Sequence, residues 1–83
     1  MNWKDRPVLI TGGASFISSH LTDKLVELGA SITVVDDLSN GKKENLAKSW
    51  DKIKFIHQDL EYISKKEITD IFTGNEIVFH FAA

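Results

Sequence analysis

The chain has 83 residues, enough for one small domain, and ten basic against twelve acidic residues leave a net charge of −2. Nucleic acids and acidic membrane surfaces attract strongly basic patches, so this balance argues against both as partners. The absence of cysteine excludes disulfides and thiolate metal sites. Because residues 1–6 are polar and the apolar run after them stops at two glycines, we expect a soluble, cytoplasmic protein without a membrane span.

Short apolar runs alternate with helical patterns along the chain. Residues 8–11 are apolar, residues 31–35 are rich in β-branched side chains, and residues 76–81, which include His80, are mostly apolar; each predicts a buried strand. Residues 53–56 predict a further, weaker strand. Residues 15–28 predict an amphipathic helix that ends at Gly29, and its apolar stripe consists of Ile17, Leu21, Leu25 and Leu28. Residues 42–48 could form a short helix. Ser64 and Glu67 have capping-box spacing ahead of a last helix, which Gly74 ends.

This alternation predicts an α/β fold with a parallel sheet and helices on its faces. Right-handed crossovers make it half of a doubly wound, Rossmann-type sheet of the order β-α-β-α-β-α-β, covering residues 1–83. We expect the strands to lie in the order third, second, first, fourth. The fourth strand is then at an edge, where it could pair with a second copy as a homodimer.

Two features predict a site for a dinucleotide. Gly12 and Gly13 lie where the first strand turns into the first helix, and unpaired N–H groups at such a helix start can bind a pyrophosphate. Asp36 ends the second strand 24 positions after Gly12, close to the roughly 20-residue spacing of the acid that binds an adenosine ribose. A carboxylate there would repel the 2′-phosphate of NADP, so the predicted cofactor is NAD.

Four blocks in this order resemble the extended short-chain dehydrogenase/reductases, the NAD-dependent sugar-nucleotide epimerases and dehydratases: LITGGASFISSHL (9–21), VVDDLSNG (34–41), HQDL (57–60) and VFHFAA (78–83). The resemblance implies that Phe16 and Ile17 contact the pyrophosphate through their backbone and that Asp36 holds the ribose. The other implied cofactor-binding residues are Gly12 and Ser15 in the turn, Asp37, Leu38, Asn40 and Gly41 around the ribose, Asp59 and Leu60 beside the adenine, and Phe81, Ala82 and Ala83 toward the nicotinamide ribose.

The sequence departs from the family pattern Thr-Gly-x-x-Gly-x-x-Gly at Ser15 and Ser18, which replace its second and third glycines. The second glycine lets the backbone approach the pyrophosphate, and the third lets the helix pack close to the sheet. We therefore expect NAD binding to be weakened but not lost. A serine hydroxyl could also donate to a phosphate.

The family's catalytic Ser or Thr and its Tyr-x-x-x-Lys pair have no counterpart here, so we expect no catalytic residue in this chain. Hydride transfer to and from a nucleotide-sugar would belong to the intact enzyme. Tyr62 and Lys66 have the pair's spacing, but they follow the third strand, and Ser64 between them is better explained as a helix cap.

Other interpretations stay open at this point. The chain could be a stand-alone, non-catalytic nucleotide-binding or regulatory module. Asp36 and Asp37 also resemble the acidic pair of response-regulator receiver domains, although that pair ends the first strand and not the second. The histidines at 20, 57 and 80 lie on different predicted elements without metal-ligand spacing, so we interpret them as structural and expect no metal.

Overall fold

A computed structural model of the chain describes residues 2–39 and 41–81. Its elements, in chain order, are β1 (Pro7–Thr11), α1 (Phe16–Glu27), β2 (Ser31–Asp36), the 3₁₀ helix η1 (Lys43–Lys52), β3 (Ile53–His57), α2 (Lys65–Phe72) and β4 (Ile77–His80). The predicted alternation is confirmed. The short helix expected at 42–48 is a 3₁₀ helix that continues to residue 52. The predicted cofactor contacts of Asn40, Ala82 and Ala83 lie outside the described residues.

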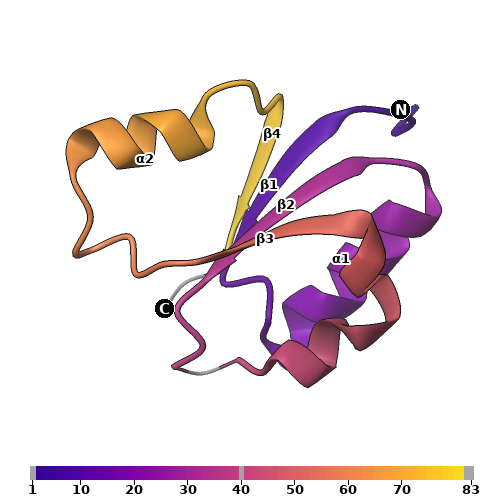
Figure 1. Ribbon diagram of the computed structural model, residues 1–83. Coiled ribbons are helices and arrows are strands. Elements are labelled where there is room, and N and C mark those ends of the chain that lie inside the picture. The colour runs from indigo at the N-terminus through magenta and orange to yellow at the C-terminus, as the bar shows by residue number, and fades with distance from the viewer. Residues whose placement is uncertain (1, 40, 82–83) are drawn as a thin grey trace.

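All four strands are parallel and lie in the predicted order, β3-β2-β1-β4. Side chains alternate between the two faces, and Ile10 of β1 is in register with Val34 of β2 and Phe79 of β4. Figure 1 shows α1 and η1 together on one face of the sheet and α2 alone on the other. This is the α/β, Rossmann-like arrangement, and it brings the carboxyl ends of all four strands to one end of the sheet.

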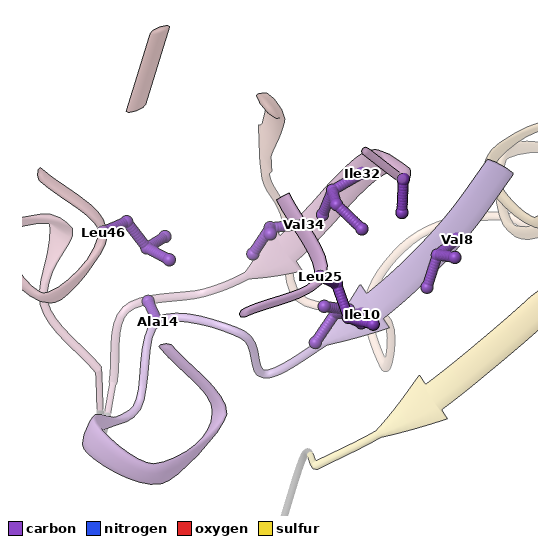
Figure 2. Packing of buried hydrophobic residues seen from close by; sticks show 8 residues of the cluster. Val8, Ile10, Ala14, Leu25, Ile32, Val34 and Leu46 are labelled. Atoms are coloured by element: carbon purple, nitrogen blue, oxygen red, sulfur yellow. The ribbon is translucent and has the colours of Figure 1, made fainter. Parts of the chain in front are cut away.

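The core lies between the sheet and the layer formed by α1 and η1. Figure 2 shows Leu25 of α1 beside Ile10 of β1, and Val34 of β2 and Leu46 of η1 belong to the same buried cluster. Burying each such side chain contributes about 1.5–3 kcal/mol. No residue of α2 is buried, although Ser64 caps this helix as predicted, its hydroxyl accepting the N–H of Glu67 at 3.1 Å. Most of the packing that holds the described residues together is therefore on the α1 face.

The predicted apolar stripe of α1 is correct for Leu21 and Leu25, which pack in or against the core, but wrong for the two residues at its ends. Ile17 is 75% exposed and Leu28 43% exposed, whereas Leu25 is buried as expected. The side chains against the sheet at the start of the helix are small and polar: Ser18 and Thr22 are fully buried. The Thr22 hydroxyl donates to the carbonyl of Ser18 at 3.0 Å, so its burial leaves no polar group unpaired. Because the helix lies close to the sheet here, the buried positions require small side chains, even though these are polar.

Candidate functional site

A pocket of about 660 Å³ opens at the carboxyl ends of the strands. In open parallel α/β sheets, this end is where ligands bind. Eight of the residues predicted for cofactor binding line it: Gly12, Ser15, Asp36, Asp37, Gly41, Asp59, Leu60 and Phe81. The structure thus brings residues from four separate segments to one pocket.

Three predicted residues do not line the pocket, and six that were not predicted do. The side chains of Phe16 and Ile17 point to solvent, and Leu38 packs against the hydrophobic core with a φ of 64°. The additional lining residues are Thr11, Val35, Ser39, Gln58, Glu61 and His80. All six lie at a strand end or just after one, so the rule that ligands bind at this end of the sheet could have found them.

The glycine-rich turn is shaped by Gly12. This residue has a φ of 71°, which an L side chain rarely adopts, and its N–H donates to the carbonyl of Val35 at 2.7 Å. Ser15 then caps α1, since its hydroxyl accepts the N–H of Ser18 at 3.3 Å. No hydrogen bond among the described residues uses the N–H groups of Phe16 and Ile17 in the first turn, and such groups attract anions.

Asp36 joins the turn to the end of β2. One carboxylate oxygen accepts the N–H of Ala14 at 2.9 Å, and the other accepts the N–H of Leu38 at 2.6 Å. The residue is only 7% exposed. Each carboxylate oxygen has a second lone pair, so the group can still accept hydrogen bonds from a ligand.

Gly41 allows the loop after β2 to lie directly against the turn. A Cβ at this position would be 2.7 Å from the carbonyl carbon of Ala14. The carbonyl oxygen of Ala14 accepts the N–H of Lys42 at 3.1 Å and the side-chain amide of Asn45 at 2.8 Å. The loop after β2 therefore depends on the close approach of Gly41 to the backbone of Ala14, which only glycine permits.

Ser15 and Ser18 form a connected pair of hydroxyls. Their Oγ atoms are 2.5 Å apart, and the Ser18 hydroxyl donates to the carbonyl of Gly12 at 2.6 Å. Ser15 has a φ of −70°, so its backbone does not require glycine. Whether the serines weaken NAD binding stays a prediction.

The sequence had placed His80 inside a buried strand, and this prediction was wrong. His80 ends β4, is exposed and lines the pocket, and its Nδ1 shares a hydrogen bond of 2.6 Å with the hydroxyl of Thr11. Thr11 ends β1 and is 1% exposed. This pair joins the ends of the two neighbouring strands at the wall of the pocket.

Asp37 contributes a fixed, exposed carboxylate. The backbone N–H of Ser39 donates to it at 2.9 Å and the Ser39 hydroxyl at 2.7 Å. These two hydrogen bonds hold the pKa of Asp37 below its ordinary value, and the nearby His57 acts in the same direction. Asp37 therefore adds negative charge beside the buried Asp36.

Residues 2–39 and 41–81 contain neither a metal site nor a membrane-spanning helix. No group of three or more histidine or acidic side chains there could hold a metal ion. None of the helices in this part of the chain is long and apolar enough to cross a membrane.

The fold is a Rossmann-like α/β unit with a pocket at the carboxyl ends of its strands, and comparison with known proteins identifies its family. The model of the NAD-dependent epimerase/dehydratase family matches residues 8–83. The chain belongs to this family, as the sequence blocks had implied. The predictions of this family and of its dependence on NAD are confirmed.

Relatives agree in sequence and in structure. UDP-glucuronic acid decarboxylase 1 of Danio rerio is 38% identical over 96% of this chain, which covers 18% of that protein. The structure of UDP-glucose 4-epimerase of Thermotoga maritima with UDP-glucose is 44% identical, with a TM-score of 0.80 over 93% of this chain and 24% of that one. The Bordetella bronchiseptica enzyme WbmF in complex with NAD⁺ is 26% identical, with a TM-score of 0.83 over 99% of this chain and 24% of that one. The chain thus spans a quarter or less of the length of these relatives.

Proposed function

We propose that this chain binds NAD and forms the N-terminal, cofactor-binding part of an enzyme that acts on a nucleotide-sugar. The observation that carries the proposal is the hydrogen bond between Asp36 and Ala14. It holds the acid that would bind the ribose against the turn that would bind the pyrophosphate. A dinucleotide needs both groups in one pocket, and here a single contact couples them.

The residues of the pocket fit such a cofactor. The free N–H groups of Phe16 and Ile17 would bind the pyrophosphate, and Asp36 would accept hydrogen bonds from the ribose hydroxyls. Asp59 and Leu60 would flank the adenine, and Phe81 would lie toward the nicotinamide. When bound, NAD supplies a hydride acceptor and donor.

The acidic groups of the pocket support a preference for NAD over NADP. The lining carboxylates are those of Asp36, Asp37, Asp59 and Glu61. Like charges repel strongly where one of them is poorly solvated, and Asp36 is almost fully buried. The 2′-phosphate of NADP would meet this negative charge.

The chemical step would need groups beyond those that the described residues bring to the pocket. The chain's single tyrosine, Tyr62, is 82% exposed and does not line the pocket. We therefore assign cofactor binding to residues 1–83, and catalysis and nucleotide-sugar binding to the rest of an intact enzyme. The stand-alone module is not favoured, because this chain covers only 18% and 24% of the relatives' lengths. A cytoplasmic location and a homodimer formed through the edge of β4 stay predictions.

Titration of the chain with NAD and NADP, followed by amide NMR, tests the proposal. We expect NAD to shift the resonances of residues 12–18 and those around Asp36, and NADP to bind at least about tenfold more weakly. Asp51→Asn is a matched control for Asp36→Asn, because Asp51 is exposed and does not line the pocket. Dispersed resonances that do not respond to NAD would contradict the proposal.

A further inference from the structure

The two serines that replace the family's glycines are unequally exposed to the pocket. Ser18 is fully buried and does not line the pocket, whereas Ser15 lies half-buried in its wall. Their Oγ atoms are nonetheless 2.5 Å apart, so the two side chains act as one hydrogen-bonded unit.

The number of hydroxyl protons decides which serine donates the hydrogen bond between Ser15 and Ser18. A hydroxyl carries one proton and can accept two hydrogen bonds. Ser18 donates its proton to the carbonyl of Gly12 at 2.6 Å. The hydrogen bond between the hydroxyls must then use the proton of Ser15, whose oxygen also accepts the N–H of Ser18. Of the two protons, only that of Ser15 borders the pocket, and it can turn toward a ligand without breaking the bond that closes the Gly12 turn.

From this we infer that Ser15 donates its hydroxyl directly to the pyrophosphate of the dinucleotide and that Ser18 is a positioning residue that holds Ser15 in place. The inference rests on the NAD binding proposed above. A hydrogen bond from a hydroxyl to an anionic phosphate oxygen is stronger than one between neutral groups, so the ligand can draw the proton of Ser15 away from Ser18. The hydroxyl then recovers part of the affinity that the serine Cβ costs.

The test compares ligands with and without phosphates. NAD, ADP and adenosine are each titrated into the wild-type chain and into Ser15→Ala. We expect Ser15→Ala to weaken NAD and ADP about tenfold, the usual size for a hydrogen bond to a charged group, and to leave adenosine unchanged. Ser19→Ala is the matched control, because Ser19 is buried in the same helix, donates to the carbonyl of Phe16 at 2.8 Å and does not line the pocket.

A second measurement needs no variant and covers the case in which loss of the helix cap unfolds Ser15→Ala. In the wild-type chain, ADP should shift the ¹³Cβ resonance of Ser15 and adenosine should not. If Ser15→Ala binds NAD as tightly as the wild type, or if ADP shifts Asp36 but leaves Ser15 unmoved, the inference is overturned. If the wild-type chain binds none of the ligands, the proposed function itself is wrong, so the two failures are distinguishable.

The positioning role of Ser18 has its own signature. Ser18→Ala should weaken ADP but not adenosine, and it should have little further effect in a chain that already carries Ser15→Ala, because the two residues act through one contact. Ser18→Thr, which keeps the hydroxyl, should restore ADP binding. Equal losses for ADP and adenosine, or full additivity of the two substitutions, would show that Ser18 only stabilises the helix and would overturn its assigned role.

Discussion

The carboxylate of Asp36 and the backbone N–H of Ala14 are joined by a hydrogen bond of 2.9 Å that links the end of β2 to the glycine-rich turn. The other oxygen of Asp36 accepts the N–H of Leu38 at 2.6 Å. A residue expected from the resemblance to hold a ribose therefore also holds together the backbone of its own site. Asp36 is therefore a stabilising residue in addition to the binding role proposed for it.

We expect Asp36→Asn to lower the free energy of unfolding by about 1–3 kcal/mol, the cost of leaving one buried N–H unpaired. An asparagine has one acceptor oxygen, so either Ala14 or Leu38 loses its partner. Urea unfolding followed by circular dichroism measures the change. Asp51→Asn should be neutral, and equal stabilities for the two variants would contradict the structural role of Asp36.

Gly41→Ala should destabilise the chain and weaken NAD binding together. The added Cβ would be 2.7 Å from the backbone of Ala14, which cannot move without distorting the turn. Overpacking of this kind costs about 1–3 kcal/mol.

Gly74→Ala is the control for Gly41→Ala, because a Cβ there meets nothing within 4 Å and carries only the backbone cost of a φ of +85°. It should leave NAD affinity unchanged. Thermal unfolding and NAD titration of both variants check this difference. A Gly41→Ala chain with wild-type affinity would show that the loop can retreat from Ala14.

Thr11→Val should lower stability by about 1 kcal/mol through the loss of the hydrogen bond to His80. Valine has nearly the same shape, so packing around this fully buried position changes little. Thr33→Val is a matched control on the same face of the neighbouring strand, where no side-chain hydrogen bond is formed among the described residues. It should be neutral or slightly stabilising, because β-branched apolar residues suit strands.

The lowered pKa of Asp37 makes a pH-dependent contribution to stability. Because its pKa is lower in the folded chain than in the unfolded one, the contribution is present above the unfolded pKa. It is lost as the pH falls through the folded pKa. Titration of the side-chain carboxyl by ¹³C NMR should give a midpoint below the ordinary aspartate value. Ser39→Ala should raise this midpoint part of the way, since the backbone N–H of Ser39 remains; no change would mean that the hydroxyl has no part in the shift.

Ser15→Gly isolates the cost of the serine Cβ. Glycine is nearly as good a helix cap as serine, so α1 should be retained. We expect this variant to bind NAD more tightly than the wild type, because removing the Cβ lets the backbone approach the pyrophosphate. The affinity gained in this way should exceed the affinity lost with the hydroxyl. Isothermal titration calorimetry of the glycine, serine and alanine forms should give affinities in that order, and a glycine form no tighter than the wild type would refute the expected steric cost.

The sequence by itself determined the order of the elements, the parallel sheet and most of the pocket. Strand periodicity, helix caps such as Ser64 and the spacing from Gly12 to Asp36 are local properties of the chain, so they can be read without coordinates. The order β3-β2-β1-β4 followed because right-handed crossovers leave few alternatives.

Only the tertiary structure decided which residues at the start of α1 meet the sheet and which unpredicted residues complete the pocket. Periodicity favoured Ile17, but the helix begins so close to the sheet that only side chains as small as those of Ser18 and Thr22 fit beneath it. The pairing of Thr11 with His80, 69 positions apart in sequence, depends on β1 and β4 becoming neighbours. Contacts of this kind arise from how strands are arranged in space, and no local pattern in the chain encodes them.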